Sequence, residues 1–489
     1  MTTLEKSRRD IMKLTALGAL SAGLVSRSDR VAAMQSGGAP RTITAQLKAL
    51  PRNSEALLLP ARYGGVDRPP APAKTDMLPR SWHKGRTKAL FDKAAELGVS
   101  AVLLRGASNV TYFTGYSFSN TERPQAVFMN EADEAPWYFH PMVDHSLVRD
   151  GWFGGDRIYF DYPHAEGGFP NKGKVVTAPG IDLMEFMLEG IKEKGVQGNR
   201  IGIDGELYAS ELAKFKKILP DVEIVDINDA VLGLRMVKTP EELALWSRAY
   251  TYHDRAQAFA RDYLLTFGTG ITDLELKFAT ELWLRDALYS ELDLAGGLPN
   301  HGVGSIGEVE VRSGPVNAYP HPNQPYYSQV VRNAPLQVVT YVMVGLCGGE
   351  NYRMYQVADE AGRFDPHGTK MWEVSLHCCE IQREMQKTGA ICGDIAYAVH
   401  KYQVDNGMED YIFTRAAHGQ TTEGHMPPYI ALGDRTALPK NSVMSVEPGL
   451  YDAARKVGYN WSDSIVTGEA SGYGMSRTPY TKDWLFVKL

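Results

Sequence analysis

The chain has 489 residues and a formal net charge of −6, and 44% of its residues are hydrophobic. This length suits two domains with sizeable cores. The acidic balance argues against a nucleic-acid-binding protein, which would normally carry a basic face, and the apolar runs are too short to predict a transmembrane helix.

The first 33 residues predict an export signal. Arg8 and Arg9 precede a modest apolar stretch at residues 14–25, and the small residues at 31–33 offer a cleavage site after Ala33. The segment SRRDIMK resembles a twin-arginine signal, so we expect recognition by the twin-arginine (Tat) export machinery and a location in the bacterial periplasm. A basic N-terminal tail without structure is the alternative interpretation.

Residues 34–81 are predicted to form a proline-rich arm without a core of its own, because seven prolines fall within this stretch. From residue 82 to 236, short apolar runs alternate with helical patterns, which predicts an α/β domain. The expected elements, in chain order, are a helix at 84–97, strands at 99–104, 110–113, 126–129 and 137–140, a helix at 181–194, a strand at 201–203, a helix at 210–219 and a strand at 222–225.

A helix start at Thr239 marks the beginning of a second expected domain, residues 237–489. Thr239 can cap the helix, Pro240 suits its first position, and Glu242 completes a capping box. The helix is expected to end near Tyr263, and the remaining chain has the pattern of an α+β domain. Its expected elements are helices at 273–287, 369–387 and 392–406, and strands near 303–312, 336–344, 410–414, 443–447 and 464–467.

The four cysteines all lie in this second half and form no CxxC pattern, so their spacing does not predict a zinc cluster. They are Cys347, Cys378, Cys379 and Cys392. Whether two of them form a disulfide in an exported protein is left open by the sequence.

The strongest local motif is SGPVNAYPH, which ends at His321. Prolines on both sides of His321 stiffen the loop, and Asn317 can fix its backbone through side-chain hydrogen bonds. A stiff loop that holds one imidazole suits a general base or a substrate clamp. A purely structural loop histidine is the alternative.

Two further motifs carry acid–base groups. His418 lies in AHGQ, His425 follows in HMPP, and Glu447 lies in SVEPGLY. In this order, and together with SGPVNAYPH, NVTYFTG and KTPEE, these motifs resemble the creatinase, prolidase and aminopeptidase P family. The resemblance covers about residues 82–489. It implies an α/β creatinase-like N-terminal domain followed by an α+β catalytic domain with the pita-bread fold.

The resemblance also implies a site for two divalent ions, held by two aspartates, one histidine and two glutamates. His418 and Glu447 match two of these five positions, whereas the other three positions have changed. The first aspartate position falls at Val339 or Thr340, the second at Glu350 or Tyr352, and the last glutamate at Ser462. One imidazole and one carboxylate cannot balance two divalent ions, so we expect no bound metal and no other cofactor.

Only Glu350 and Asp463 could rebuild a metal site. Asp463 directly follows the changed position, so on a strand its side chain would point to the opposite face. The strand pair around residues 335–357 contains no aspartate but several tyrosines, which suggests a pocket with aromatic walls and phenolic donors. Core or dimer-contact tyrosines are the alternative. We predict His321, His418 and Glu447 as catalytic residues, and His425, Tyr319, Tyr352 and Glu350 as substrate-binding residues.

The leading hypothesis is a metal-independent acid–base enzyme that acts on a small, aromatic or otherwise planar molecule. A lyase with His321 as its base is favoured, because hydrolysis without a Lewis acid must activate water against a poor electrophile. Creatinase, whose loop histidine matches His321, is the family precedent for metal-free chemistry. The alternatives are a creatinase-like C–N hydrolase, a metal-dependent peptidase of the prolidase or aminopeptidase P type, and an exported non-catalytic binding protein. The resemblance further implies a homodimer.

Overall fold

The computed structural model describes residues 47–60, 67–118, 121–160, 165–166, 181–292, 304–321 and 327–489. The predicted export signal and part of the proline-rich arm lie outside the described residues. The chain divides into two compact units, Met1–Pro51 and Arg52–Leu489. The second unit contains every predicted site residue and is the one described below. The domain boundaries predicted at residues 33, 81 and 236 stay predictions.

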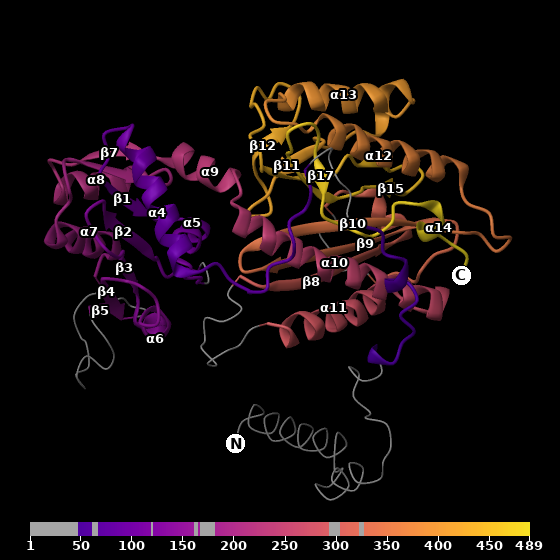
Figure 1. The fold of residues 1–489 in the computed structure, drawn as a ribbon, viewed down its shortest axis with the longest axis horizontal. Helices are drawn as coiled ribbons and strands as arrows, with labels where there is room; N and C mark the ends of the chain where they lie inside the picture. The colour runs from indigo at the N-terminus through magenta and orange to yellow at the C-terminus, as the bar shows by residue number, and fades with distance from the viewer. Residues whose placement is uncertain are drawn as a thin grey trace, which may run out of the picture. The chain divides into compact units, whose positions relative to one another are not determined.

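A mixed seven-stranded sheet forms the core of the first half of this unit (Figure 1). Its strand order is β5-β4-β3-β2-β1-β6-β7, and the interior strand β1 pairs antiparallel with β2 and parallel with β6. All four residues of β1 are buried, as expected for a strand that reads as a continuous apolar run. The strands are β1 (Ala101–Leu104), β2 (Ala126–Asn130), β3 (Trp137–Pro141), β4 (Gly155–Phe160), β5 (Ala165–Glu166), β6 (Arg200–Ile203) and β7 (Glu223–Asp226), and the helices are α4 (Arg80–Ala95), α5 (Ala107–Thr114), α6 (His145–Val148), α7 (Leu183–Lys194), α8 (Ala209–Ile218) and α9 (Asn228–Met236).

Residues 110–113, expected as a strand, lie instead in helix α5. Their β-branched and aromatic side chains favour strands, but Val110, Tyr112 and Phe113 are buried from a helical backbone. The helix is closed by Gly115, whose φ of 75° forms a left-handed cap. Tertiary packing therefore overrides local propensity at this point.

Helix α10 (Pro240–Phe267) begins where the sequence predicted. The Thr239 hydroxyl accepts a hydrogen bond from the Glu242 backbone N–H, and the Glu242 carboxylate accepts one from the Thr239 N–H, at 3.3 and 2.8 Å. These two bonds satisfy donors that the first helical turn leaves without partners. The helix ends at Phe267, four residues beyond the expected Tyr263, and Gly268 has a φ of 60°.

The second half of this unit is built on a four-stranded sheet with the order β18-β10-β9-β8. Strands β9 (Ala334–Val344) and β10 (Cys347–Val357) form an antiparallel hairpin, and positive φ angles at Gly345 and Leu346 make its two-residue turn. Figure 1 shows α10 and α11 on one side of this sheet and α12 and α13 on the other. The further elements are α11 (Asp273–Ser290), β8 (Ile306–Ser313), α12 (Pro366–Met385), α13 (Cys392–Asp405), α14 (Lys482–Leu485) and β18 (Phe486–Val487).

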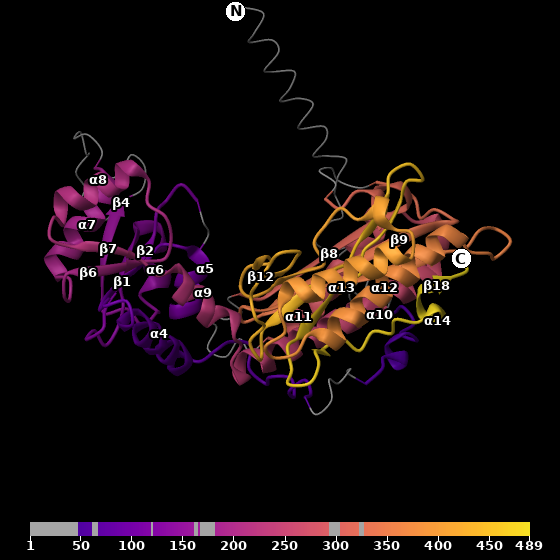
Figure 2. The same ribbon diagram turned by 90° about the horizontal axis from the view of Figure 1, so that it is seen from above.

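A five-stranded sheet with the order β12-β11-β13-β16-β17 completes the second half of the unit. Helices α12 and α13 run side by side, as both views show (Figure 2). Residues 410–414 were expected as a strand but form a short 3-10 turn, Glu409–Tyr411, followed by irregular chain, because Phe413 is exposed rather than packed in a sheet. The five strands are β11 (Ala417–Gly419), β12 (Met426–Ile430), β13 (Val443–Val446), β16 (Asp463–Val466) and β17 (Tyr473–Gly474), and β14 (Leu450–Asp452) and β15 (Val457–Tyr459) form a separate two-stranded sheet.

The expected combination of an α/β half and an α+β half is confirmed. All four cysteines are free thiols, and three of them are buried. Within the described part of the chain, no helix combines the length and the apolarity needed to cross a membrane.

Candidate active site

The centre of the site is the buried imidazole of His418. Strand β11 lies between β12 and β13, which places His418 opposite Tyr429 on one side and Ser445 on the other. Its Nδ1 donates to the carbonyl of Gly419 at 3.1 Å. Its Nε2 lies 2.8 Å from Glu447 Oε1 and 3.5 Å from Glu350 Oε1, but makes no aligned hydrogen bond among the described residues.

Glu350 extends from the neighbouring sheet and is held by several donors. Tyr352 donates its hydroxyl to Glu350 Oε2 at 2.6 Å, and Ser445 donates to Oε1 at 2.5 Å. Burial alone would raise the pKa of Glu350, but these bonds and the charge of His418 lower it. Burial raises the pKa of Tyr352 well above its usual value, so the phenol stays a donor.

The two carboxylates also fix the protonation state of His418. Burial opposes a charged imidazole, yet Glu350 and Glu447 raise the pKa of His418 to about 10. The pKa of Glu447 is raised, because it is buried and lies near the charge of Glu350. In the protein alone, a cationic His418 therefore balances an ionised Glu350.

Uncharged side chains that form hydrogen bonds occupy the region where the family resemblance implied further carboxylates. Ser462 lies 2.9 Å from Ser445, hydroxyl to hydroxyl, and Ser464 donates to Gln420 at 2.7 Å. Thr340 lies 2.7 Å from Nδ1 of a fully buried histidine, His253. Burial lowers the pKa of His253 to about 3, so this ring is neutral.

Asp463 is turned away from this cluster, as its position on the strand predicted. Its Oδ2 lies 3.7 Å from the guanidinium of Arg353, which is fully buried on β10. Arg353 also donates to the hydroxyl of Ser476 at 2.7 Å. Asp463 therefore belongs to a structural ion pair rather than to the His418 cluster.

A cavity of about 310 Å³ opens onto the cluster and brings several predicted residues together. His321, His425, Tyr352 and Glu447 all line it. The ring of His425 stacks on that of His418 with a centroid distance of 3.8 Å and an angle of 15° between planes. The other lining residues are Arg312, Pro320, Phe413, Thr414, Arg415, Tyr451 and Asn460.

Two predicted substrate-binding residues do not line this cavity. Tyr319 is 57% exposed and is not part of the wall, and Glu350 lies behind the wall in the buried cluster. Arg312 and Arg415 both reach the cavity, and neither was among the predicted site residues. Each arginine stands next to a recognised motif, and that proximity was the signal that could have identified them.

A buried arginine positions the loop that carries His425. Arg235, which is 1% exposed, donates to the hydroxyls of Thr421 and Thr422 at 2.8 and 2.9 Å, and to Asn109 at 2.6 Å. Its guanidinium also lies 3.3 Å from Glu423. The loop that leads to the second histidine of the site is thus tied to helices α5 and α9.

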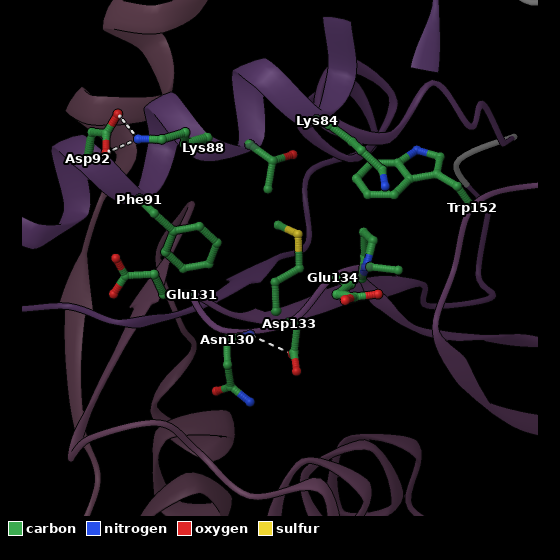
Figure 3. Close-up of a pocket in the computed structure, with 13 residues that line it drawn as sticks. Lys84, Lys88, Phe91, Asp92, Asn130, Glu131, Asp133, Glu134 and Trp152 are labelled. Carbon is green, nitrogen blue, oxygen red and sulfur yellow. Dashed lines mark hydrogen bonds and ion pairs between the residues drawn. The ribbon is translucent and has the colours of Figure 1, made fainter. Parts of the chain in front are cut away.

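A second cavity, of about 340 Å³, lies in the first half of the unit. Figure 3 shows Lys84 and Lys88 on one side of it and Asp133 and Glu134 on the other. It contains none of the motif residues, and Lys88 is already bound by Asp92 at 2.8 Å. The His418 cavity is therefore the candidate active site.

Two family models match this chain. Residues 86–237 match the creatinase/prolidase N-terminal domain, and residues 255–469 match metallopeptidase family M24. The chain belongs to this family of creatinase, prolidase and aminopeptidase P relatives.

Individual relatives support the same assignment. A protein named uncharacterized hydrolase/peptidase y4tL, from Sinorhizobium fredii, is 26% identical over 181 residues, which cover 36% of this chain and 44% of that protein. An Xaa-Pro dipeptidase from Pyrococcus furiosus is 24% identical over 284 residues, which cover 57% of this chain and 74% of that enzyme. The crystal structure of the dipeptidase PepE from Mycobacterium ulcerans superposes with a TM-score of 0.65 at 18% identity, covering 84% of this chain and all of that one.

These matches overturn the leading functional hypothesis. The relatives are named peptidases and dipeptidases of a metallopeptidase family, so the prediction of a metal-independent lyase is wrong. The prediction of an enzyme of this family is confirmed, and its hydrolase alternatives agree with the matches. The homodimer and the catalytic role of each residue stay predictions.

The buried donors fit one divalent ion better than two. With Nδ1 bound to the Gly419 carbonyl, a neutral His418 would present its Nε2 lone pair to Glu350 and Glu447. One imidazole and two carboxylates form a donor set for a borderline divalent ion, and their two negative charges balance it. Val339 and Ser462 add no charge for a second ion.

Proposed function

We propose that this chain hydrolyses the peptide bond of a dipeptide or a similarly small amide that carries a free carboxylate. The observation that carries the proposal is a cavity with two arginines at its wall and the His418–Glu350–Glu447 cluster at its base. Arginine is the residue best suited to bind a carboxylate, because its planar fork donates two parallel hydrogen bonds. The names of the relatives support the same substrate class.

Each residue of the cluster has a chemical task in this proposal. Glu350, His418 and Glu447 would hold one divalent ion, which supplies a polarised carbonyl and an acidified water when it is bound. Glu447 is the member of this set that lines the cavity, so it is the ligand nearest to a bound substrate. Tyr352 and Ser445 keep Glu350 in place through their hydrogen bonds.

Arg415 is the better candidate for binding the substrate carboxylate. Among the described residues, no acidic side chain lies within ion-pair distance of it; its Nη2 contacts His425 at 3.2 Å, and its guanidinium lies over the ring of Tyr429. Arg312, in contrast, is paired with Glu310 at 3.1 Å and donates to the carbonyl of Pro320. A substrate carboxylate would therefore meet Arg415 with less competition.

Replacing Arg415 with glutamine should raise KM for dipeptides by about 10- to 100-fold and change kcat little, because the lost bonds involve two charged groups. Steady-state kinetics should be measured on a dipeptide and on the same dipeptide with an amidated C-terminus. The amide should bind weakly to the native protein and should be insensitive to the substitution. Arg435→Gln, an exposed arginine outside the cavity wall, is the matched control.

Two outcomes would contradict different parts of the proposal. Equal effects of Arg415→Gln on the acid and the amide would reject carboxylate binding by Arg415 but leave the hydrolysis intact. Absence of amino-acid release from a broad panel of dipeptides, with divalent ions supplied, would reject the dipeptidase activity itself.

A creatinase-like C–N hydrolase is the second candidate, because His321 lies at the cavity wall where its imidazole can reach a bound molecule. Such an enzyme would cleave ureido or guanidino compounds and ignore dipeptides. Assaying both substrate classes with one preparation separates the two candidates.

We also propose that the protein is exported to the periplasm, on the basis of Arg8 and Arg9. Changing both residues to lysine should retain the protein in the cytoplasm. Fractionation of cells that express each form tests this, and an unchanged distribution would reject the twin-arginine mechanism.

A further inference from the structure

Two histidines and an aspartate converge in the first half of the unit, far along the chain from the cluster of the candidate active site. His140 lies near the end of β3, His145 begins the short helix α6, and Asp156 lies on β4. Strands β3 and β4 pair in parallel, with Tyr138 opposite Asp156, which brings the three side chains to one place. One potential ligand atom from each residue lies within 4.8 Å of the others.

The ring of His140 is fully buried between two groups that can only accept hydrogen bonds. Its Nδ1 lies 2.9 Å from the carbonyl oxygen of Pro141, so this nitrogen carries the proton. Its Nε2 lies 3.4 Å from Oδ2 of Asp156. Because burial lowers the pKa of His140, the ring is neutral, and Nε2 presents a lone pair to a carboxylate.

His145 approaches the same oxygen. Its Nδ1 lies 3.5 Å from Asp156 Oδ2, is shielded from solvent, and has no hydrogen-bond partner among the described residues. The rings of His140 and His145 are nearly parallel, with a centroid distance of 5.8 Å and an angle of 9°. Two imidazole nitrogens and one carboxylate oxygen thus face one another. The contact from His140 has the geometry of a long hydrogen bond, but Nδ1 holds the one proton of the neutral ring, so Nε2 has none to donate to Asp156.

The distances match coordination better than hydrogen bonding. N–H···O bonds cluster at about 2.9 to 3.0 Å, whereas the two nitrogen–oxygen distances here are 3.4 and 3.5 Å. In a tetrahedral site with bonds of about 2.1 Å, neighbouring ligand atoms lie about 3.4 Å apart. The bond from Nδ1 of His140 to a backbone carbonyl is the usual support for a metal-binding imidazole.

We propose that His140, His145 and Asp156 bind one divalent transition-metal ion, with zinc as the best match to two imidazoles and a carboxylate. Asp156 is the exposed member of the set, so the ion has access from solvent and a water molecule can complete its coordination. The ion would join the end of β3, the start of α6 and β4. This site is independent of the proposed hydrolysis.

The test is zinc binding to the full chain, purified without a histidine tag and freed of metal. Calorimetric titration and metal analysis should be done in a Glu447→Gln background, which weakens binding at the His418 cluster. We expect one tight equivalent in this background. Adding Asp156→Asn should weaken it by about 100-fold or more, since losing even a supporting contact of a metal ligand costs 10- to 100-fold.

A matched control uses another histidine–aspartate pair. His367 Nε2 lies 3.0 Å from Asp452 Oδ2, and no third ligand completes a cluster there among the described residues. His367→Gln should leave the zinc equivalent unchanged. His145→Gln, at a second partly exposed position, should remove it as Asp156→Asn does. Zinc binding that survives both substitutions, or no tight zinc binding in the Glu447→Gln background, would overturn the proposal.

Discussion

Replacing Glu447 with glutamine is expected to lower dipeptide turnover by about 100-fold or more, because it removes one of the two carboxylates that would hold the ion, and losing even a supporting contact of a metal ligand costs about 10- to 100-fold. Glu447 is the carboxylate that both lines the cavity and contacts His418, at 2.8 Å. Glutamine has nearly the same shape but is not basic and carries no charge. The measurement is kcat on one dipeptide, with circular dichroism to verify the fold.

His321→Asn provides the comparison for this prediction. His321 is exposed at the cavity wall, so its loss should reduce turnover less than the loss of Glu447. The reverse order, with the asparagine variant inactive and the glutamine variant only slowed, would make His321 the base. That outcome would favour the creatinase-like candidate over the dipeptidase.

Replacing Arg353 with methionine is expected to lower the free energy of unfolding by about 3–5 kcal/mol, as for other buried pairs that lose one partner. The Arg353 side chain is completely buried, lies 3.7 Å from Asp463 and donates to Ser476 at 2.7 Å. Its guanidinium also lies over the ring of Tyr480, 4.2 Å from the centroid. Methionine fills much of the space but leaves the Asp463 carboxylate without this buried cation.

Urea denaturation at neutral pH measures this loss, and Arg363→Met is the matched control. Arg363 pairs with Asp359 at 2.9 Å, but its side chain is 78% exposed, so its loss should cost less than about 1 kcal/mol. Similar, small losses for the two variants would show that the buried ion pair contributes little. A double change of Arg353→Met and Asp463→Asn should recover part of the lost stability, because it removes the buried charge as well.

The parts of the fold that local chemistry dictates could be predicted from the sequence. The capping box of Thr239 and Glu242 is a local interaction, so it sets the start of α10 independently of how the rest of the chain folds. His418 and Glu447 were identified from short motifs, and the structure brings them into contact. Residues 110–113 were misassigned, because strand propensity alone cannot report that packing selects a helix there.

The parts that depend on strand register could not be predicted. The sequence left Glu350 and Tyr352 as candidates for one position, because residues two apart on a strand point to the same face and alternation cannot separate them. The two-residue turn at Gly345 and Leu346 fixes the register and directs Glu350 to His418. Arg415 was not predicted, although it lies two residues before the AHGQ motif, because the sequence does not show which exposed arginine borders a cavity.

The hydroxyl and amide groups around the His418 cluster affect whether the chain can fold before it binds an ion. Ser445, Ser462, Ser464 and Gln420 bind one another and Glu350, so most of this interior is satisfied by the polypeptide itself. A core crowded with carboxylates would repel itself until an ion arrived, which couples maturation to ion supply. Here a protonated His418 provides the compensating charge, so a newly made chain can reach its final architecture before it binds the ion of the proposed function.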